Sequence, residues 1–391
     1  MRLDDLAFYT TFLPLALAIF FGMRGVAALV RAGHATVVRL SVIVLIAASL
    51  WFVAVAPAGR WMLVTAATAF ALGPVIERLR LAGQRTGALA LLVVAIVVAA
   101  AMFALARWEL GGRAFVFIGI TVICSHAIAY VIDVYRGDAT AARPLESVLY
   151  LMQFPALNGG PIVRSKDFSS HHLRLNLGIS LGDFTYGVRR VVIGLVKIRL
   201  VADVLGRPAT VIFALPTTRL STDAAWLGAV CFALQIYFEF SGYADLAIGL
   251  GRIFGLRYPE NFRRPYVADS VREFWRRWNI TSIMWLRDYL SLPIAGRDAP
   301  TLRLLLNIFL GFCIVGLWHG AGWTVVTWAA FSSAWLAVEA VGFGALLERW
   351  PRVLRHAYVL MVTLFGWLLL RAETHAHAWA FLRAMAGHGA T

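Results

Sequence analysis

The amino-acid sequence predicts an all-α, polytopic integral membrane protein. Hydrophobic residues make up 60% of the 391 residues and charged residues only 15%, which leaves too little polar surface to cover a soluble globule. Apolar runs recur along the chain at lengths that reach or approach the roughly 20 residues of a spanning helix. We therefore expect lipid to be the solvent for most of this chain.

Nine apolar runs predict helices of spanning length. They cover residues 6–21, 40–55, 61–76, 88–106, 114–132, 224–250, 304–318, 324–341 and 357–370. With the further helices described next, we expect about ten to twelve crossings. No internal repeat or low-complexity linker divides the sequence, so residues 1–391 are interpreted as a single integral membrane domain.

Two segments depart from the simple spanning pattern. Residues 147–163 are apolar but contain Pro155 and Pro161 on either side of two glycines, a composition that favours a broken or re-entrant segment lining a protected cavity. Residues 188–205 mix aliphatic and charged side chains, which indicates a tilted or buried helix.

The charge balance identifies a lipid surface, rather than nucleic acid, as a partner. The net charge is +15, and arginines cluster in alternate early loops, as the positive-inside rule describes. We interpret this excess of positive charge as a consequence of membrane topology and of attraction to anionic membrane lipid. The three cysteines all lie in apolar runs, and no cluster of Cys or acidic residues accompanies either histidine pair. We therefore expect no metal site and no tightly bound cofactor.

His319 is the strongest candidate for a catalytic group. It lies in the run Val315-Gly-Leu-Trp-His-Gly-Ala-Gly-Trp323, where no other side chain titrates. Imidazole exchanges protons near neutral pH, and a titratable group at membrane depth is usually functional. A histidine that only pairs with a neighbouring helix is the alternative interpretation.

The segment 252–297 combines arginines with aromatic residues, so it does not suit a lipid-facing span. Ser270 and Glu273 have the spacing of a capping box at the start of a helix. The arginines of such a helix contact lipid phosphates at the membrane interface in one interpretation. In the other, Arg276, Arg277 and Arg287 face a polar substrate.

A second polar group ends the long apolar run at 224–250. Glu239, Ser241 and Asp245 follow one another there, close to Tyr243. Carboxylates in such a position are expected to be paired or to face water. A structural ion pair and a role in the site fit the pattern equally well, and we interpret Asp245 as lining the site.

Several of these motifs, in this order and spacing, resemble the membrane-bound O-acyltransferases. The matching elements are Tyr237–Gly251, Pro259-Glu-Asn-Phe262, Phe274-Trp-Arg-Arg-Trp278, Trp285-Leu-Arg-Asp-Tyr289 and Gly316-Leu-Trp-His-Gly320. The branch that the chain resembles most is the bacterial alginate O-acetylation proteins, followed by the teichoic-acid D-alanyl transferases. The similarity is strongest across residues 129–328.

The resemblance implies a reaction, a tunnel and a set of site residues. An acyl group would be transferred to a hydroxyl at a tunnel through the membrane core, with His319 as the general base and Trp318 helping to exclude water. The residues implied to line the substrate site are Trp318, Ser241, Tyr243, Asp245, Glu239, Trp275, Arg276, Arg277, Trp278, Arg287 and Asp288.

At one position the chain differs from the bacterial branches. Asn279 stands where those branches usually carry a second histidine after Trp-Arg-Arg-Trp. Asparagine is no base, but it can donate a hydrogen bond to a carbonyl or orient a substrate. We therefore assign Asn279 to the catalytic pair with His319, without a two-histidine mechanism.

The resemblance also implies partners and a location. The protein would lie in the cell inner membrane, take an acyl thioester (acetyl-coenzyme A or an acyl carrier) from the cytoplasmic side, and serve an extracytoplasmic polysaccharide or a periplasmic transferase. Acetyl is the expected group and D-alanyl the alternative. A non-catalytic translocation protein is a further hypothesis, although the repeat symmetry expected of transporters is not visible.

Overall fold

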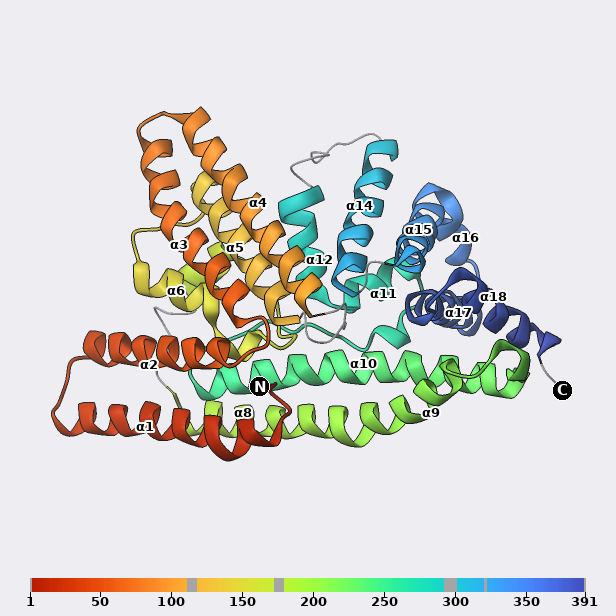
Figure 1. Ribbon diagram of the computed structural model, residues 1–391, viewed down its shortest axis with the longest axis horizontal. Helices are drawn as coiled ribbons and strands as arrows, with labels where there is room; N and C mark the ends of the chain where they lie inside the picture. The colour runs from red at the N-terminus through yellow and green to blue at the C-terminus, as the bar shows by residue number, and fades with distance from the viewer. Residues whose placement is uncertain (1, 111–117, 172–178, 292–300, 320–321, 390–391) are drawn as a thin grey trace. The chain divides into compact units, whose positions relative to one another are not determined.

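The computed structural model of the protein describes residues 2–110, 118–171, 179–291, 301–319 and 322–389 (Figure 1). Within these ranges every regular element is a helix, so the predicted all-α class is confirmed. In the described parts of the chain, seven helices are long and apolar enough to cross a membrane: Phe8–Leu29, His34–Ala54, Gly59–Leu81, Arg85–Glu109, Thr222–Ile253, Trp323–Leu347 and Arg352–Arg371. The apolar helix Leu305–Trp318 is shorter. The chain is a multi-pass membrane protein, and the exact number of crossings stays a prediction.

The chain forms two compact units, each described here by itself. The first contains residues 1–193 and 243–259, and the second contains residues 194–242 and 260–391. The longest helix, α10 (Thr222–Ile253), contributes residues to both.

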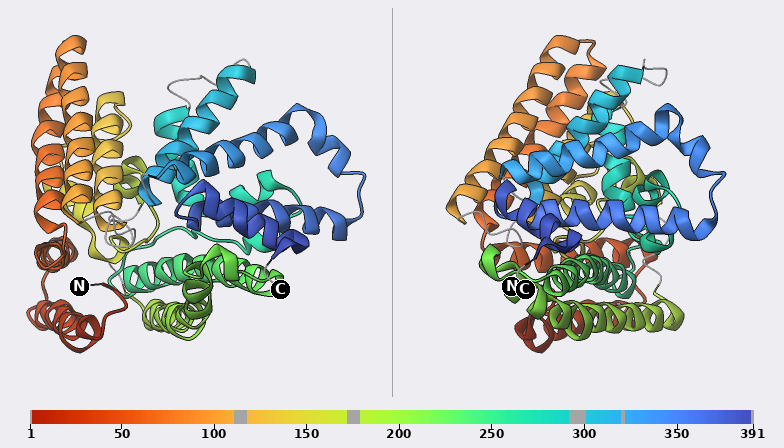
Figure 2. Two further views of the ribbon diagram at one scale, coloured as in Figure 1. Left: turned by 45° about the vertical axis from the view of Figure 1, so that its right-hand side comes forward. Right: turned by 90° about the vertical axis from the view of Figure 1, so that its right-hand side faces the viewer.

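The first unit consists of α1 (Leu13–Leu29), α2 (His34–Ala54), α3 (Gly59–Leu81), α4 (Arg85–Glu109), α5 (Ile118–Arg136), α6 (Pro144–Met152), η3 (Phe154–Ala156), α7 (Ser165–His171) and most of α8 (Leu181–Leu195), preceded by η1 (Phe8–Phe12). Helices α3, α4 and α5 pack side by side (Figures 1 and 2). Phe12 packs against Phe52 and Phe154 at ring-centroid distances of 5.6 and 5.2 Å. This aromatic core joins the start of the chain to the segment that follows α6.

The segment 147–163 is broken, as its composition predicts. Helix α6 ends before Pro155, and a single 3-10 turn follows. Two backbone groups of this segment are paired with side chains: Phe154 N–H donates to Ser49 Oγ at 3.1 Å, and the Val163 carbonyl accepts from the Tyr150 hydroxyl at 2.9 Å. The interruption is therefore a buried, hydrogen-bonded feature of the first unit.

The segment 188–205 belongs to a long helical stretch formed by α8, η4 (Val196–Ala202) and α9 (Asp203–Phe213). Buried positions such as Val191, Ile198 and Ala202 recur at helical spacing, while Val192 and Leu200 are exposed. The predicted helix is confirmed, but it is buried along one side only.

The second unit completes the chain with η5 (Thr217–Arg219), η6 (Pro265–Val267), α11 (Val271–Arg277), α12 (Ile280–Leu286), η7 (Arg287–Ser291), α14 (Thr301–His319), α15 (Trp323–Val338), η8 (Glu339–Phe343), α16 (Gly344–Leu347), α17 (Arg352–Arg371), α18 (His375–Arg383) and η9 (Ala384–His388). Helix α15 packs against both α14 and α17. The close approach of α14 and α15 depends on Gly316, because a Cβ there would lie 2.5 Å from Val325 Cγ1.

Candidate functional site

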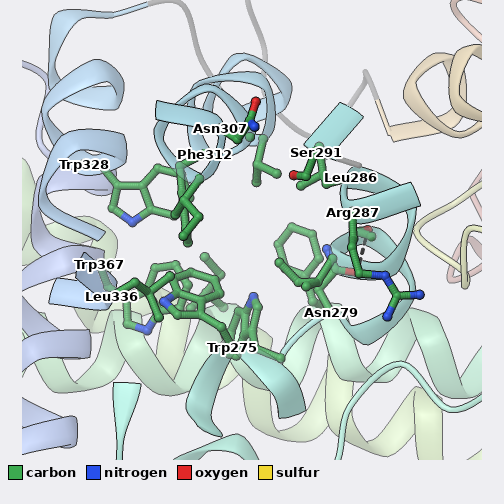
Figure 3. A pocket seen from close by; sticks show the side chains of 18 residues that line it. Trp275, Asn279, Leu286, Arg287, Ser291, Asn307, Phe312, Trp328, Leu336 and Trp367 are labelled. Carbon is green, nitrogen blue, oxygen red and sulfur yellow. Dashed lines mark hydrogen bonds between the residues drawn. The ribbon is translucent and has the colours of Figure 1, made fainter. Parts of the chain in front are cut away.

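A cavity of about 290 Å³ lies inside the second unit. Its walls come from α10, α11, α12, η7, α14, α15 and α17 (Figure 3). The lining residues are Ile236, Phe240, Trp275, Trp278, Asn279, Ser282, Ile283, Leu286, Arg287, Ser291, Asn307, Ile308, Gly311, Phe312, Val315, Trp328, Leu336 and Trp367. The lining is mostly apolar with a few polar groups, which is typical of a small-molecule site.

Two antiparallel helical segments border this cavity. One is α12 with η7, and the other is α14, which contacts η7 (Figures 1 and 3). The lining residues of each segment recur at spacings of three and four, so one face of each helix borders the cavity. Asn307 and Ser291 lie on one side of the cavity in Figure 3, and Asn279 lies on the opposite side.

Asn279 lies in the turn between α11 and α12 and has left-handed backbone dihedrals (φ 44°, ψ 51°). Asparagine is one of the few non-glycine residues that adopt this conformation readily. Its Oδ1 accepts a hydrogen bond from Ser282 Oγ at 2.8 Å. That bond fixes the orientation of the carboxamide, whose donor group is Nδ2.

Asn261 stabilises this turn by accepting hydrogen bonds from it. Its carbonyl accepts from Ile280 N–H at 2.9 Å, and its Oδ1 accepts from the Thr281 N–H and hydroxyl at 3.1 and 2.9 Å. These bonds satisfy donors that the start of α12 would otherwise leave unpaired. The Pro-Glu-Asn-Phe motif of the sequence therefore positions Asn279.

Tryptophans form much of the wall next to Asn279. Trp278 packs on Trp367 at a ring-centroid distance of 4.7 Å, and Trp275 packs on Phe312 at 4.8 Å. Trp367 Nε1–H donates to the Tyr266 hydroxyl at 3.1 Å, and that hydroxyl donates to the Ala233 carbonyl at 2.6 Å. Burial raises the pKa of Tyr266, which keeps its proton available for that bond.

His319 is the last residue of α14, and its side chain lies outside the described residues. Its position along the helix is nevertheless informative. It follows Val315 by four residues and Ile308 by eleven, and both lengths return to nearly the same face of an α-helix. Val315 and Ile308 both line the cavity.

The predicted arginines take different positions. Arg287 lines the cavity, and its Nε donates to the buried Asp288 carboxylate at 2.7 Å. Arg276 and Arg277 pair with Glu273 at 3.1 and 2.7 Å. Neither belongs to the described lining, and the Arg276 side chain is 74% exposed. The structure thus brings Arg287 to the cavity and turns Arg276 toward the outside of the unit.

The polar group at the end of α10 divides between the two units. Tyr243 and Asp245 belong to the first unit, where the Tyr243 hydroxyl donates to Asp4 at 2.9 Å and Asp245 pairs with Arg190. Ser241 and Glu239 belong to the second unit and lie outside the described cavity lining. The ion pair of Asp245 matches the structural interpretation of this motif, and a role for these four residues in substrate binding stays a prediction.

Trp318 also lies outside the described lining and packs against Trp285, with ring centroids 6.3 Å apart. Several lining residues, by contrast, were not expected from the sequence. These are Ile236, Phe240, Ser282, Ile283, Leu286, Ser291, Asn307, Ile308, Gly311, Phe312, Val315, Trp328, Leu336 and Trp367. The sequence does contain a signal for Asn307, because a polar amide within the apolar run 304–318 indicates a functional position. Among the described residues, no group of three His, Cys, Asp or Glu side chains gathers as a metal site.

Comparison with known proteins identifies the family. Residues 39–369 match the membrane-bound O-acyltransferase family. A probable alginate O-acetylase of Azotobacter vinelandii is 39% identical over 273 residues, covering 70% of this chain and 54% of the relative. A peptidoglycan O-acetyltransferase of Helicobacter pylori is 34% identical, covering 62% and 47%. A teichoic acid D-alanyltransferase of Bacillus subtilis is 26% identical, covering 52% and 54%.

The chain spans about half the length of the curated relatives it matches. The family match itself covers most of the chain, including every residue of the cavity lining. This chain therefore belongs to the membrane-bound O-acyltransferase family.

Proposed function

We propose that this chain transfers an acetyl group from a thioester to a hydroxyl of an extracytoplasmic polysaccharide, or to a partner transferase that serves one. The observation that carries the proposal is the cavity of the second unit, which has Asn279 in its wall and is bordered by the face of α14 on which position 319 falls. The relatives named as acetylases of alginate and peptidoglycan support acetyl as the group.

In the proposed reaction, His319 accepts the proton of the attacking hydroxyl. The hydroxyl oxygen bonds to the thioester carbonyl carbon, the carbon–sulfur bond breaks, and the thiolate leaves and takes up the proton. The Asn279 Nδ2 group donates a hydrogen bond to the carbonyl oxygen as negative charge develops on it. The tryptophan walls exclude water, which would otherwise compete as acceptor.

The donor of this reaction is a cytoplasmic acyl thioester, acetyl-coenzyme A or an acyl carrier, and the membrane is the cell inner membrane. Arginine-rich loops on the inner side would contact anionic lipid there. The proposed transfer requires no bound cofactor, because the thioester is a substrate.

The experiment that tests the proposal replaces His319 with alanine. We expect His319→Ala to reach the membrane at the wild-type level and to lose acetyl transfer at least about a hundredfold, because a positioned base contributes that much. His375→Ala is the matched control, since His375 is an exposed histidine of the same unit that bonds Thr327 at 2.7 Å. Near-normal transfer by His319→Ala would reject the assigned base.

D-alanyl transfer is the second candidate, favoured by the similarity to teichoic acid D-alanyltransferases. Membranes containing the chain are supplied in parallel with an acetyl thioester and with a D-alanyl carrier thioester, and the acylated products are counted. Faster D-alanyl transfer would replace acetyl in the proposal. Movement of a substrate across the membrane without any acylated product would instead support a translocation protein.

A further inference from the structure

The Asn307 side chain is a buried amide in the cavity wall with no hydrogen-bond partner among the described residues. It lies on the apolar helix α14 and is 1% exposed, and neither its Nδ2 nor its Oδ1 pairs with any part of the chain that the structure describes. The other asparagines of this region each accept a hydrogen bond at Oδ1: Asn279 Oδ1 accepts from Ser282 and Asn261 Oδ1 accepts from Thr281.

A buried amide without partners opposes folding, since it loses its bonds to water and gains none in return. A leucine would suit its apolar neighbours better. Groups of this kind in a cavity wall are candidates for ligand binding, because a ligand can supply the missing partners.

The position of Asn307 shows which part of a ligand it reaches. It lies near Ser291 in Figure 3, on the side of the cavity opposite Asn279. Along α14 it precedes position 319 by twelve residues, which corresponds to about 18 Å. Asn307 is therefore too far from the proposed base to act on the reacting carbonyl, and would contact a remote part of a bound substrate.

We propose that Asn307 binds an amide group in the arm of the acyl donor. The Asn307 carboxamide offers one donor group and one acceptor, and an amide of the arm can pair with either, its C=O with Nδ2 or its N–H with Oδ1. The apolar wall between the two ends of the cavity suits the methylene chain of such an arm. This inference rests on the proposed acyl transfer and makes Asn307 a specificity-determining residue.

Two donors carry the same amide-bearing pantetheine arm, free acetyl-coenzyme A and an acetylated acyl carrier protein. The test measures transfer by the full chain in membranes with each of these donors and with S-ethyl thioacetate, which has no amide. We expect Asn307→Leu to raise KM for the arm-bearing donor about tenfold, the effect of losing one net hydrogen bond. The kcat should stay within about threefold, and KM for S-ethyl thioacetate should not change.

A second measurement does not depend on transfer. Thermal unfolding of the purified chain should show that Asn307→Leu is more stable than wild type without ligand, and that it gains less stability from coenzyme A. Ser333→Ala is the control, because Ser333 is buried in the same unit, bonds the Ala329 carbonyl at 2.7 Å and lies outside the described lining. Asn307→Ser serves as a smaller second variant.

The outcomes separate this inference from the proposed function. An effect confined to either arm-bearing donor supports the inference and identifies the donor. The inference would be overturned if Asn307→Leu changed KM equally for all three donors, or for none of them, and if coenzyme A stabilised this variant as much as wild type. A third outcome is that wild type shows no acyl transfer and is still stabilised by coenzyme A, while Asn307→Leu is not. In that case the proposed acyl transfer fails and the binding role of Asn307 stands.

Discussion

At the scale of single residues, the backbone at position 279 decides which side chains can serve there. A left-handed conformation with φ 44° disfavours most residues, while Asn, Asp, His and Gly adopt it more readily. Asn279 therefore combines a tolerated backbone with an amide whose orientation Ser282 fixes. The histidine that the family resemblance implies at this position in the bacterial branches would satisfy the same backbone restriction.

This conformation sharpens the test of Asn279. Asn279→Gly removes the amide without backbone strain, whereas Asn279→Ala adds left-handed strain of about 1–2 kcal/mol. If the amide stabilises the developing oxyanion, both variants should raise the activation barrier for transfer by about 2–4 kcal/mol. Their loss of transfer rate should be smaller than that of His319→Ala.

Asn279→His completes the series and should keep activity if the cavity accepts the ring. Transfer rates are compared at matched membrane levels. Full activity in Asn279→Gly would place this residue outside the reaction, and a defect seen only in Asn279→Ala would assign the effect to the backbone.

At the scale of elements, a buried carboxylate fixes the start of α11. Glu339, in η8, accepts hydrogen bonds from Val271 N–H at 2.7 Å, Arg272 N–H at 2.9 Å and the Tyr358 hydroxyl at 3.1 Å. These are donors that the first turn of a helix leaves unpaired, and a negative charge there suits the helix dipole. Helix α11 carries Trp275 and leads directly to Asn279, so Glu339 positions both.

Glu339→Gln should loosen this arrangement. The amide keeps one acceptor oxygen and leaves at least one buried N–H of α11 unpaired, which costs about 1–3 kcal/mol of unfolding free energy. Thermal unfolding of the purified protein measures the loss, with the exposed Glu348→Gln of the same unit as the control. Equal stability of the two variants would show that the carboxylate does not hold α11.

The contact between α14 and α15 gives a second prediction at this scale. Gly316→Ala places a Cβ against Val325, so we expect a loss of about 1–3 kcal/mol from overpacking and a displaced end of α14. Gly25→Ala is the control, since no atom lies within 4 Å of its Cβ and alanine favours the helix. Unfolding curves of the two variants should shift in opposite directions.

At the scale of the whole chain, the sequence predicts the helical class and the broken segment 147–163 well, because both depend on composition along the chain. It also predicts Asn279, Trp275 and Trp278 as neighbours, since they are close in sequence. It does not predict which face each residue presents. Arg276 and Arg277 turn to Glu273, and Asn307 joins the cavity only through the return of α14 beside η7.

The first unit should respond to acid through Asp183. Hydrogen bonds from Ser180 and from Arg252 lower the pKa of this carboxyl; the Arg252 contact is 2.9 Å. Because the pKa of Asp183 is lower in the folded state, the ionised carboxylate stabilises the unit at pH values above the ordinary aspartate pKa, near 4. This stabilisation is lost as the pH falls through the lowered pKa of the folded state.

Melting temperatures between pH 6 and 3 test this effect. Wild type should lose stability with acid more steeply than Asp183→Asn, which lacks the titrating group. Asp203→Asn removes an exposed pair with Arg199 and should behave like wild type. Parallel curves for wild type and Asp183→Asn would contradict the role assigned to this carboxyl.

The length of α10 ties the protein to bilayer thickness. Its 32 residues extend about 48 Å, well beyond the roughly 30 Å of a hydrocarbon core. The helix must tilt or leave the core within its length. Two of its three carboxylates, Glu239 and Asp245, lie in the second half. The acyl-chain length of the surrounding lipid would then set which turn of α10 meets the headgroups. Reconstituted in short-chain and long-chain phospholipids, the protein should therefore differ in transfer rate.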